Sequence, residues 1–364
     1  MSNLIIGLGG CGNNVINELA KDDLFNDGTT LYAIDSIMYN VNMDNINRIN
    51  HICVLSDNKA GSGRNRDRGK AMYEFHEEQG EFDEMYKTAE NSTEPVIVIT
   101  SGAGGTGSGS CVPVCKALIE REIQVIPIIV CPNKQDPAAF HLNTNDLLME
   151  LDEIGVITYS IFENRKGDAD YTPINTEIVQ LIEIIFGKKY DKTDLDSIDD
   201  SDLDVILNTP GRLIAVSAEA NSIPALQKEL TRKLFVGFQP VWKPEDVNAN
   251  TLMTAFALKS MFADVDFKQV FAEIDNRIDP DQVYDNYRNI VKADNNGVSS
   301  ASVIISGLPR SDIKEIKGEY KEAEGLGAGI NKSVRPNFMK KKKASVDRVT
   351  LGNNEKPLNK FKWH

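Results

Sequence analysis

The chain has 364 residues, of which 41% are hydrophobic and 26% are charged, the proportions of a globular protein with about two domains. No apolar run approaches the ~20 residues that cross a bilayer, which excludes a membrane-spanning protein, and we expect no membrane partner. The N-terminus lacks the basic start of a secretory signal, so we expect a cytoplasmic protein. The five cysteines, an odd number, favour free thiols over a set of disulfides.

Charge is distributed unevenly along the chain. Residues 331–364 contain ten Lys or Arg and two Asp or Glu, a net charge of +8. Residues 1–330 contain 30 basic and 52 acidic residues, and the whole chain carries a net charge of −14. An acidic body with a basic end predicts that this end contacts an anionic partner.

Apolar segments in the first half predict five buried strands, at residues 4–9, 31–35, 51–55, 95–100 and 123–131. Helices are expected over about 13–21 and after the glycine-rich segment 101–110. Strands that alternate with helices and consist of continuous apolar runs are typical of a parallel sheet covered on both faces. The sequence therefore predicts a doubly wound α/β domain whose ligands bind at the carboxyl ends of its strands.

The second half has a different pattern. Residues 174–186 are apolar around most of a helix, which is typical of a buried helix, here between two domains. The residues that follow predict a smaller α+β domain with a strand at 213–216, helices near 222–235 and 266–277, and a strand at 302–307.

These patterns divide the chain into four parts. They are a first domain at 1–171, a long central helix at 172–187, an acidic loop with the second domain at 188–310, and a helix with a basic tail at 311–364. The tail is rich in Gly, Lys and Asn and has few apolar residues. We therefore expect it to be flexible on its own.

The most informative segment is Ser101–Ser110, which contains five glycines between a strand and a helix. Glycine lets the backbone approach an anion closely, and the N-terminus of a helix adds positive potential. Gly7–Asn13 is a second segment of this kind, and Ala60–Asn65 is a third candidate. Several converging loops suit a triphosphate, whereas the GxxxxGK(S/T) motif of P-loop enzymes is absent.

The second glycine segment leaves a Rossmann-type enzyme as an alternative. Gly7, Gly9 and Gly12 match the dinucleotide fingerprint GxGxxG, and Asp35 follows at about the distance of a ribose contact. A nicotinamide-dependent oxidoreductase would use one phosphate loop and a catalytic His or Tyr/Lys pair. His141 lies in a plausible loop, but the sequence offers it no partner.

Residues Ala103–Gly109 resemble the GGTG(S/T)G signature of the tubulin/FtsZ superfamily of polymerising GTPases. The resemblance implies that residues 1–171 bind GTP or GDP with Mg²⁺. It also implies that the three glycine segments contact the phosphates through Gly9, Gly10, Cys11, Gly12, Asn13, Gly61, Ser62, Gly63, Gly102, Ala103, Gly104, Gly105, Thr106, Gly107 and Ser108.

The same resemblance implies that Asn164, Tyr171 and Asn175 bind the guanine base. An amide offers a donor and an acceptor to the edge of guanine, and an aromatic ring offers a stacking face. The alternative is that Asn164 is a turn residue and Asn175 a helix cap. Asp35 and Asp136 are expected near the ribose or the metal.

An aspartate-rich segment at 197–204 resembles the family's catalytic loop, which reaches into the nucleotide pocket of the next subunit. The resemblance implies that Asp199 and Asp202 are the catalytic carboxylates, although Ser197 replaces the usual Asn. A carboxylate of this kind orients or deprotonates the attacking water. Hydrolysis would then be coupled to a head-to-tail filament of the protein with itself. The alternative is a merely solvated acidic loop.

The irregular loops and the basic tail look most like the divergent TubZ/PhuZ-type proteins of plasmids and bacteriophages, which act on DNA in the cytoplasm of a bacterial host. This resemblance implies that the tail binds a DNA-bound adaptor protein or DNA itself. A neighbouring subunit or simple solubility are the other roles for the tail. A cell-division ring protein of the FtsZ kind is the alternative within the family.

Overall fold

The computed structural model describes a large part of the chain, namely residues 3–22, 25, 28–37, 48–56, 61–133, 135–164, 170–186, 200–239, 253–260, 267–278, 285–292 and 299–309. Asp199, Ser197, Ala60 and the basic tail lie outside the described residues.

The first domain is built on six parallel strands in the order β3-β2-β1-β4-β5-β6. Their bounds are β1 Asn3–Leu8, β2 Thr29–Asp35, β3 His51–Val54, β4 Val96–Ser101, β5 Val125–Cys131 and β6 Thr158–Glu163. Every residue of β5 is buried, as the continuous apolar run predicts. The predicted doubly wound α/β architecture is confirmed.

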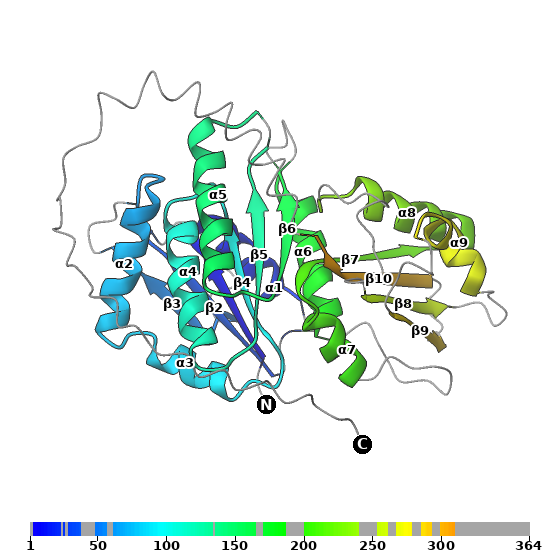
Figure 1. The fold of residues 1–364 in the computed structure, drawn as a ribbon, viewed down its shortest axis with the longest axis horizontal. Helices are drawn as coiled ribbons and strands as arrows, with labels where there is room; N and C mark the ends of the chain where they lie inside the picture. Colours follow the sequence, from blue (N-terminus) through cyan, green and yellow to red (C-terminus); the bar gives the residue numbers. More distant parts are fainter. Residues whose placement is uncertain are drawn as a thin grey trace, which may run out of the picture.

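Helices cover both faces of this sheet (Figure 1). On one face lie α1 Gly9–Leu19 and α6 Thr172–Ile185, over strand residues such as Ile5, Ile97 and Ile128. On the other face lie α3 Asp83–Glu90, α4 Thr106–Ile119 and α5 Ala138–Glu153, while α2 Arg66–Glu78 packs against α4. Alternate strand residues, such as Ile6 and Val98, point into this second core. Among the helices of the described residues, none is both long and apolar enough to span a bilayer.

The second domain continues the sheet with mixed strands. Its elements are α7 Asp200–Leu207, β7 Gly211–Ala220, α8 Ile223–Val236, β8 Met253–Ser260, α9 Phe267–Arg277, β9 Asp285–Lys292 and β10 Ser299–Leu308. β10 pairs antiparallel with β7 and β8, and β8 pairs parallel with β9. The two parts of the sheet meet where β6 pairs with β7 at Thr158–Gly211 and Tyr159–Arg212. A smaller α+β domain is therefore confirmed.

Two helices begin where the sequence pattern did not place them. α1 was expected from residue 13 but begins at Gly9, whose φ of 68° turns the chain directly from strand to helix. The aspartate-rich segment, expected as a loop, is helical from Asp200. Leu203, Ile206 and Leu207 are buried at helical spacing, and this apolar stripe explains why the acidic segment folds as a helix.

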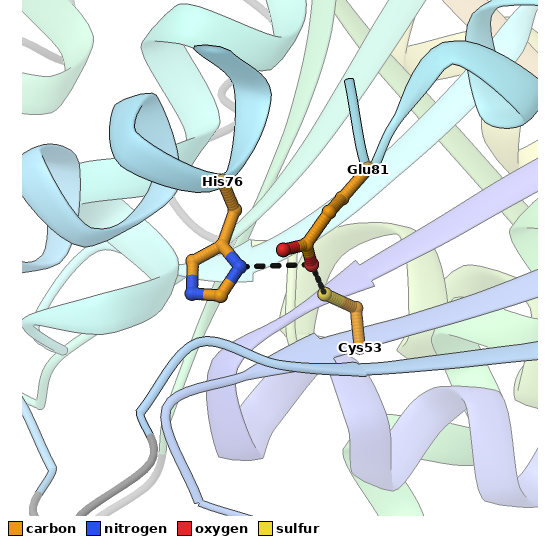
Figure 2. A group of neighbouring side chains, drawn as sticks. All are labelled: Cys53, His76 and Glu81. Atoms are coloured by element: carbon orange, nitrogen blue, oxygen red, sulfur yellow. Dashed lines mark hydrogen bonds and ion pairs between the residues drawn. The ribbon is translucent and has the colours of Figure 1, made fainter. Parts of the chain in front are cut away.

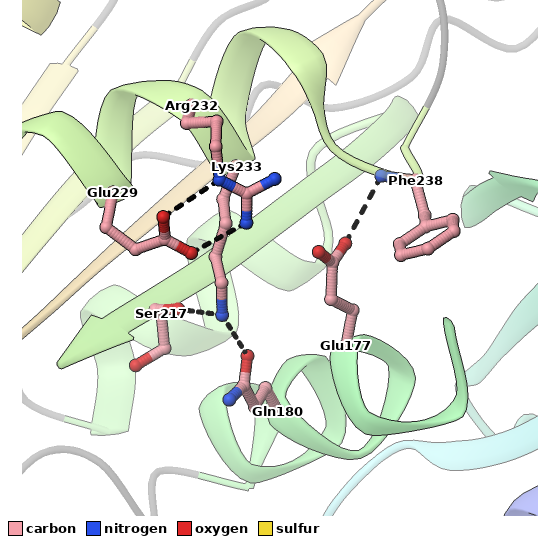
Figure 3. A network of polar contacts seen from close by, with 7 residues as sticks. All are labelled: Glu177, Gln180, Ser217, Glu229, Arg232, Lys233 and Phe238. Atoms are coloured by element: carbon pink, nitrogen blue, oxygen red, sulfur yellow. Dashed lines mark hydrogen bonds and ion pairs between the residues drawn. The ribbon is translucent and has the colours of Figure 1, made fainter. Parts of the chain in front are cut away.

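A polar network joins the central helix α6 to the second domain (Figure 3). The ammonium group of Lys233 in α8 donates to Gln180 Oε1 in α6 at 2.9 Å and to the carbonyl of Ser217 in β7 at 2.7 Å. Burial lowers the pKa of Lys233, and nearby Glu177 counteracts this effect. Glu177 also accepts the backbone N–H of Phe238 at 3.2 Å. These contacts fix β7 and α8 of the second domain relative to the central helix.

Candidate functional site

A cavity of about 740 Å³ opens at the carboxyl ends of the parallel strands, between the first turns of α1, α4 and α6. Such an edge is where doubly wound sheets bind their ligands. Most of the residues that the sequence singled out line this one cavity: Gly9, Gly10, Cys11, Asp35, Gly61, Ser62, Gly63, Ala103, Gly104, Gly105, Thr106, Gly107, Asp136, Asn164, Tyr171 and Asn175.

Two residues of the second glycine segment, Gly7–Asn13, that were predicted to bind phosphate do not line the cavity. Asn13 is 1% exposed and does not line it, whereas Asn14 does. A Cβ atom at Gly12 would lie 2.3 Å from the carbonyl oxygen of Ile99, so this glycine lets α1 pack on β4. Because α1 begins at Gly9, residues 10, 11 and 14 share its cavity side. A helix predicted to begin at Gly9 instead of residue 13 would also have identified Asn14 as a residue on the cavity side.

Gly102 and Ser108 also lie outside the cavity lining. A Cβ atom at Gly102 would come within 2.5 Å of Thr144 Oγ1 in α5. The Ser108 hydroxyl is fully buried and donates to the carbonyl of Gly104. Both residues therefore shape the loop before α4 rather than face a ligand.

Direct contacts join the glycine segments at 61–65 and 101–110 to each other and to Ser36, which follows β2. Thr106 Oγ1 lies 2.8 Å from Ser36 Oγ and 3.0 Å from Ser62 Oγ, so hydroxyls from three loops meet. A Cβ atom at Gly105 would lie 2.3 Å from Ser62 Oγ and 2.7 Å from the backbone nitrogen of Asn65. Only glycine permits this approach, which brings the backbones of two loops to one side of the cavity. Their N–H groups and hydroxyls suit a polyphosphate.

Arg64 is a lining residue that the sequence pattern did not identify. It is the single basic side chain among the described residues of the lining, and its backbone has a φ of 62°. Its guanidinium carbon lies 4.6 Å from the ring centre of Phe140. Asn143 Nδ2 donates to the carbonyls of Arg64 at 3.1 Å and Ala103 at 3.2 Å, which ties two of the glycine segments together. A cation at this place favours an anionic ligand.

The two acidic residues of the cavity are fixed by local hydrogen bonds. Asp35 Oδ1 accepts the backbone N–H of Ser36 at 2.7 Å. Asp136 Oδ2 accepts the backbone N–H of Asn133 at 2.8 Å. Carboxylate oxygens suit a ribose hydroxyl or Mg²⁺. Their place in the lining fits the predicted ribose or metal loop, which stays a prediction.

The far end of the cavity is formed by the start of α6 and the end of β6. The helix begins at Thr172, so Asn175 is an internal helix residue and not its cap. Asn175 donates its backbone N–H to the carbonyl of Tyr171 at 3.0 Å, one turn earlier. Its side chain is buried, whereas Tyr171 is 51% exposed. An exposed ring and two amides, from Asn175 and Asn164, are thus presented to one end of the cavity.

Replacement of Asn175 by alanine tests this end of the cavity. We expect Asn175→Ala to weaken GTP binding by about tenfold, since a lost hydrogen bond of this kind costs ~1–3 kcal/mol. Discrimination against ATP should fall as well. Equilibrium titration with GTP and ATP measures both effects, with Thr176→Ala, an exposed neighbour on α6, as the control. Unchanged GTP affinity would remove Asn175 from the base site.

Helix α7, which contains Asp202, lies near the amino ends of the parallel strands (Figure 1), whereas the cavity opens at their carboxyl ends. The end of this helix is bound to the amino ends of β5 and β6. Gln124, just before β5, donates its side-chain N–H to the carbonyl of Leu207 at 3.2 Å. Thr158, the first residue of β6, donates its hydroxyl to the carbonyl of Thr209 at 2.9 Å. The central helix α6, which begins at the cavity, has 14 residues and is therefore ~21 Å long.

Residues 2–166 match the Tubulin/FtsZ family, GTPase domain. This confirms the resemblance to that superfamily that the glycine segment indicated. No curated protein matches the chain.

Solved structures of three related kinds resemble the fold of nearly the whole chain. CetZ from Methanosaeta thermophila strain DSM 6194 is 19% identical, with 90% of this chain and 93% of that chain covered and a TM-score of 0.70. A GTPγS-form protofilament of Bacillus thuringiensis serovar israelensis TubZ is 17% identical, with 90% of this chain and 91% of that chain covered and a TM-score of 0.66. An FtsZ dimer from M. jannaschii is 17% identical, with 84% of this chain and 88% of that chain covered and a TM-score of 0.62. The likeness extends to all three kinds and does not select the plasmid and phage proteins.

Proposed function

On the premise of a GTPase domain of the Tubulin/FtsZ type, we propose that this protein is a filament-forming GTPase whose active site is shared between two subunits. The observation that carries the proposal is the separation of the nucleotide cavity from α7. Asp202 lies at the amino ends of the strands and the cavity at their carboxyl ends, so this carboxylate cannot reach a nucleotide bound to its own chain. A head-to-tail neighbour can bring the two together.

GTP would lie with its phosphates against the glycine segments and its base between Asn164, Tyr171 and Asn175. The backbone N–H groups at the start of α4 and the Arg64 guanidinium would bind the phosphate charge. Mg²⁺ would take oxygen ligands from Asp35 or Asp136, and when bound it offsets charge on the phosphates.

Asp202 of the neighbouring subunit would then orient the water that attacks the γ-phosphate and accept its proton. The bond between the γ-phosphorus and the bridging oxygen breaks, and GDP and phosphate are released. Bulk water would be excluded from the nucleotide only when the neighbouring subunit covers the cavity. Hydrolysis would therefore occur in the filament and not in the monomer.

The oxidoreductase alternative fits the cavity less well. In the dinucleotide fingerprint, Gly7-x-Gly9-x-x-Gly12, the third glycine serves helix packing, as Gly12 does here. The cavity, however, is also lined by two further glycine segments, one of which begins α4. A single pyrophosphate would leave these additional donors unused. A triphosphate makes use of them.

The proposed cellular role rests on the resemblance to TubZ/PhuZ-type proteins and on the basic residues near the end of the sequence. We propose that the filament moves or positions plasmid or phage DNA in a bacterial cytoplasm, and that the basic residues of 331–364 attach it to DNA or to a DNA-bound adaptor. A cell-division ring remains the alternative. Filament attachment to a DNA fragment, lost on removal of residues 331–364 and weakened by salt, would favour the first role.

Assembly and hydrolysis should depend on protein concentration together. We expect light scattering to rise with GTP and not with ATP above a critical concentration, because each site needs two subunits. GTPase activity per molecule should fall towards zero on dilution below that concentration. If activity per molecule stays constant on dilution, the site is complete within one chain and the proposal is wrong.

A further inference from the structure

A second group of chemically active side chains lies away from the nucleotide cavity. Cys53 comes from β3, His76 from the last turn of α2, and Glu81 from the connection between α2 and α3 (Figure 2). One ligand atom of each lies within 4.8 Å of the other two. None of the three lines the nucleotide cavity, so they are not part of the proposed GTP site.

We propose that Cys53, His76 and Glu81 form a binding site for a zinc ion. A thiolate, an imidazole nitrogen and a carboxylate are a normal zinc ligand set, and three protein ligands leave one position for water. Ligand atoms around one zinc ion are roughly 3–4 Å apart, so side-chain shifts of about 1 Å would complete this site. Cys53 and His76 are half-buried and Glu81 is exposed, so an ion can enter without unfolding the chain.

The contacts of His76 give this proposal its second observation. His76 Nε2 lies 3.2 Å from the carbonyl of Leu55, which can only accept a hydrogen bond, so this nitrogen carries a proton. In a neutral ring, Nδ1 then presents a lone pair. That atom is buried and lies 2.8 Å from Glu81 Oε2, yet the two are not aligned as a hydrogen bond. A lone pair facing a carboxylate oxygen needs a cation, either a proton or a metal.

The same carboxylate oxygen also faces the thiol. Glu81 Oε2 is 3.9 Å from Cys53 Sγ, so the imidazole and the thiol converge on one oxygen, as Figure 2 shows. Hydrogen bonding of Nε2 to a backbone carbonyl is the usual way in which proteins orient a histidine ligand. Leu55 therefore has the role of an outer partner that fixes the tautomer with Nδ1 free to bind.

Zinc at this place would tie three elements together. β3 is one of the two edge strands of the sheet among the described residues. α2 begins beside a phosphate loop, where Asn65 Oδ1 accepts the backbone N–H of Arg68 at 2.8 Å. The zinc site is at the other end of the same helix. The ion would therefore hold the edge strand to a helix whose first turn adjoins the nucleotide cavity.

The experiment uses Co²⁺ as a spectroscopic probe on the full chain without a histidine tag. A Co²⁺–thiolate bond gives a charge-transfer absorption that no oxygen or nitrogen ligand produces. We expect one Co²⁺ per chain with this band, displaced by Zn²⁺. Cys53→Ser should abolish the band, and His76→Gln and Glu81→Gln should each weaken Zn²⁺ binding by more than roughly tenfold, the least that the loss of even an outer partner costs. Zn²⁺ should raise the melting temperature of the wild type by more than that of these variants at the same Zn²⁺ concentration.

His51→Gln and Glu84→Gln are the matched controls. His51 lies in the same strand as Cys53, and its Nε2 is 3.9 Å from Glu84 Oε1. Both variants should retain the band and the zinc affinity. No thiolate band in the wild type, or a band that survives Cys53→Ser, would overturn the proposal. Should Cys53→Ser fail to fold by circular dichroism, His76→Gln decides: zinc affinity equal to that of the wild type would also overturn it.

Discussion

Asp202→Ala should bind GTP as a monomer with wild-type affinity and yet hydrolyse it roughly 10²–10⁴-fold more slowly, the range for loss of a general base. Binding survives because Asp202 lies at the end of the sheet remote from the cavity of its own chain. Filaments should form with GTP and persist, since subunits stay in the GTP state. Phosphate release measures the hydrolysis rate, and sedimentation of the same samples measures how much of the protein is in filaments.

Asp204→Ala is the control for this variant. Asp204 lies two residues further along α7, its side chain is exposed, and its backbone carbonyl accepts a hydrogen bond from Asn208. Its removal should leave hydrolysis nearly normal. Asp199→Ala is expected to act like Asp202→Ala. Polymerised Asp202→Ala that turns over GTP at the wild-type rate would disprove the role of this residue.

Gly105→Val should weaken GTP binding by roughly 100-fold, because a side chain forced into a close contact costs ~1–3 kcal/mol. The first side-chain atom would already lie 2.3 Å from Ser62 Oγ and 2.8 Å from the backbone carbon of Arg64. The two loops must then separate, and the hydroxyl contact between Thr106 and Ser62 is lost. Equilibrium titration with GTP measures the effect, and melting by circular dichroism reports whether the fold is kept.

Gly104→Ala provides the comparison for Gly105→Val. A Cβ atom at Gly104 meets only the carbonyl oxygen of Ser101, at 3.9 Å, so the loops can stay together. We expect a smaller loss of affinity than at Gly105. Equal and wild-type affinity in both variants would show that this segment does not bind the phosphates.

Much of the first domain could be predicted because its strands are continuous apolar runs. Val125–Cys131 is buried throughout, and a continuous apolar run of this length is typical of a parallel strand covered on both faces. Helix α2 was not predicted, since among its residues only Gly69 and Tyr73 are buried and its apolar stripe is correspondingly weak. Four aspartates in the segment 199–204 concealed α7, although Leu203 and Ile206 have helical spacing.

The candidate site was predictable as a set of loops but not residue by residue. Glycine marks both close contact with a ligand and close contact between elements, and the sequence does not distinguish them. Gly12 serves packing, whereas Gly10 lines the cavity. Arg64 and Phe140 are 76 positions apart in the chain, and their contact depends on how α5 lies beside the third glycine segment. No local pattern carries that information.

The shared active site is tested most directly by mixing two inactive variants. At a GTP concentration that saturates the wild type but not the weakened site, Gly105→Val binds little nucleotide but keeps Asp202, and Asp202→Ala has the converse defect. Each should be nearly inactive alone. In a mixture with GTP, the Asp202→Ala subunit binds the nucleotide and a Gly105→Val neighbour supplies the carboxylate, so we expect hydrolysis well above the sum of the separate rates. Co-sedimentation of the two variants with no more activity than that sum would contradict the shared site.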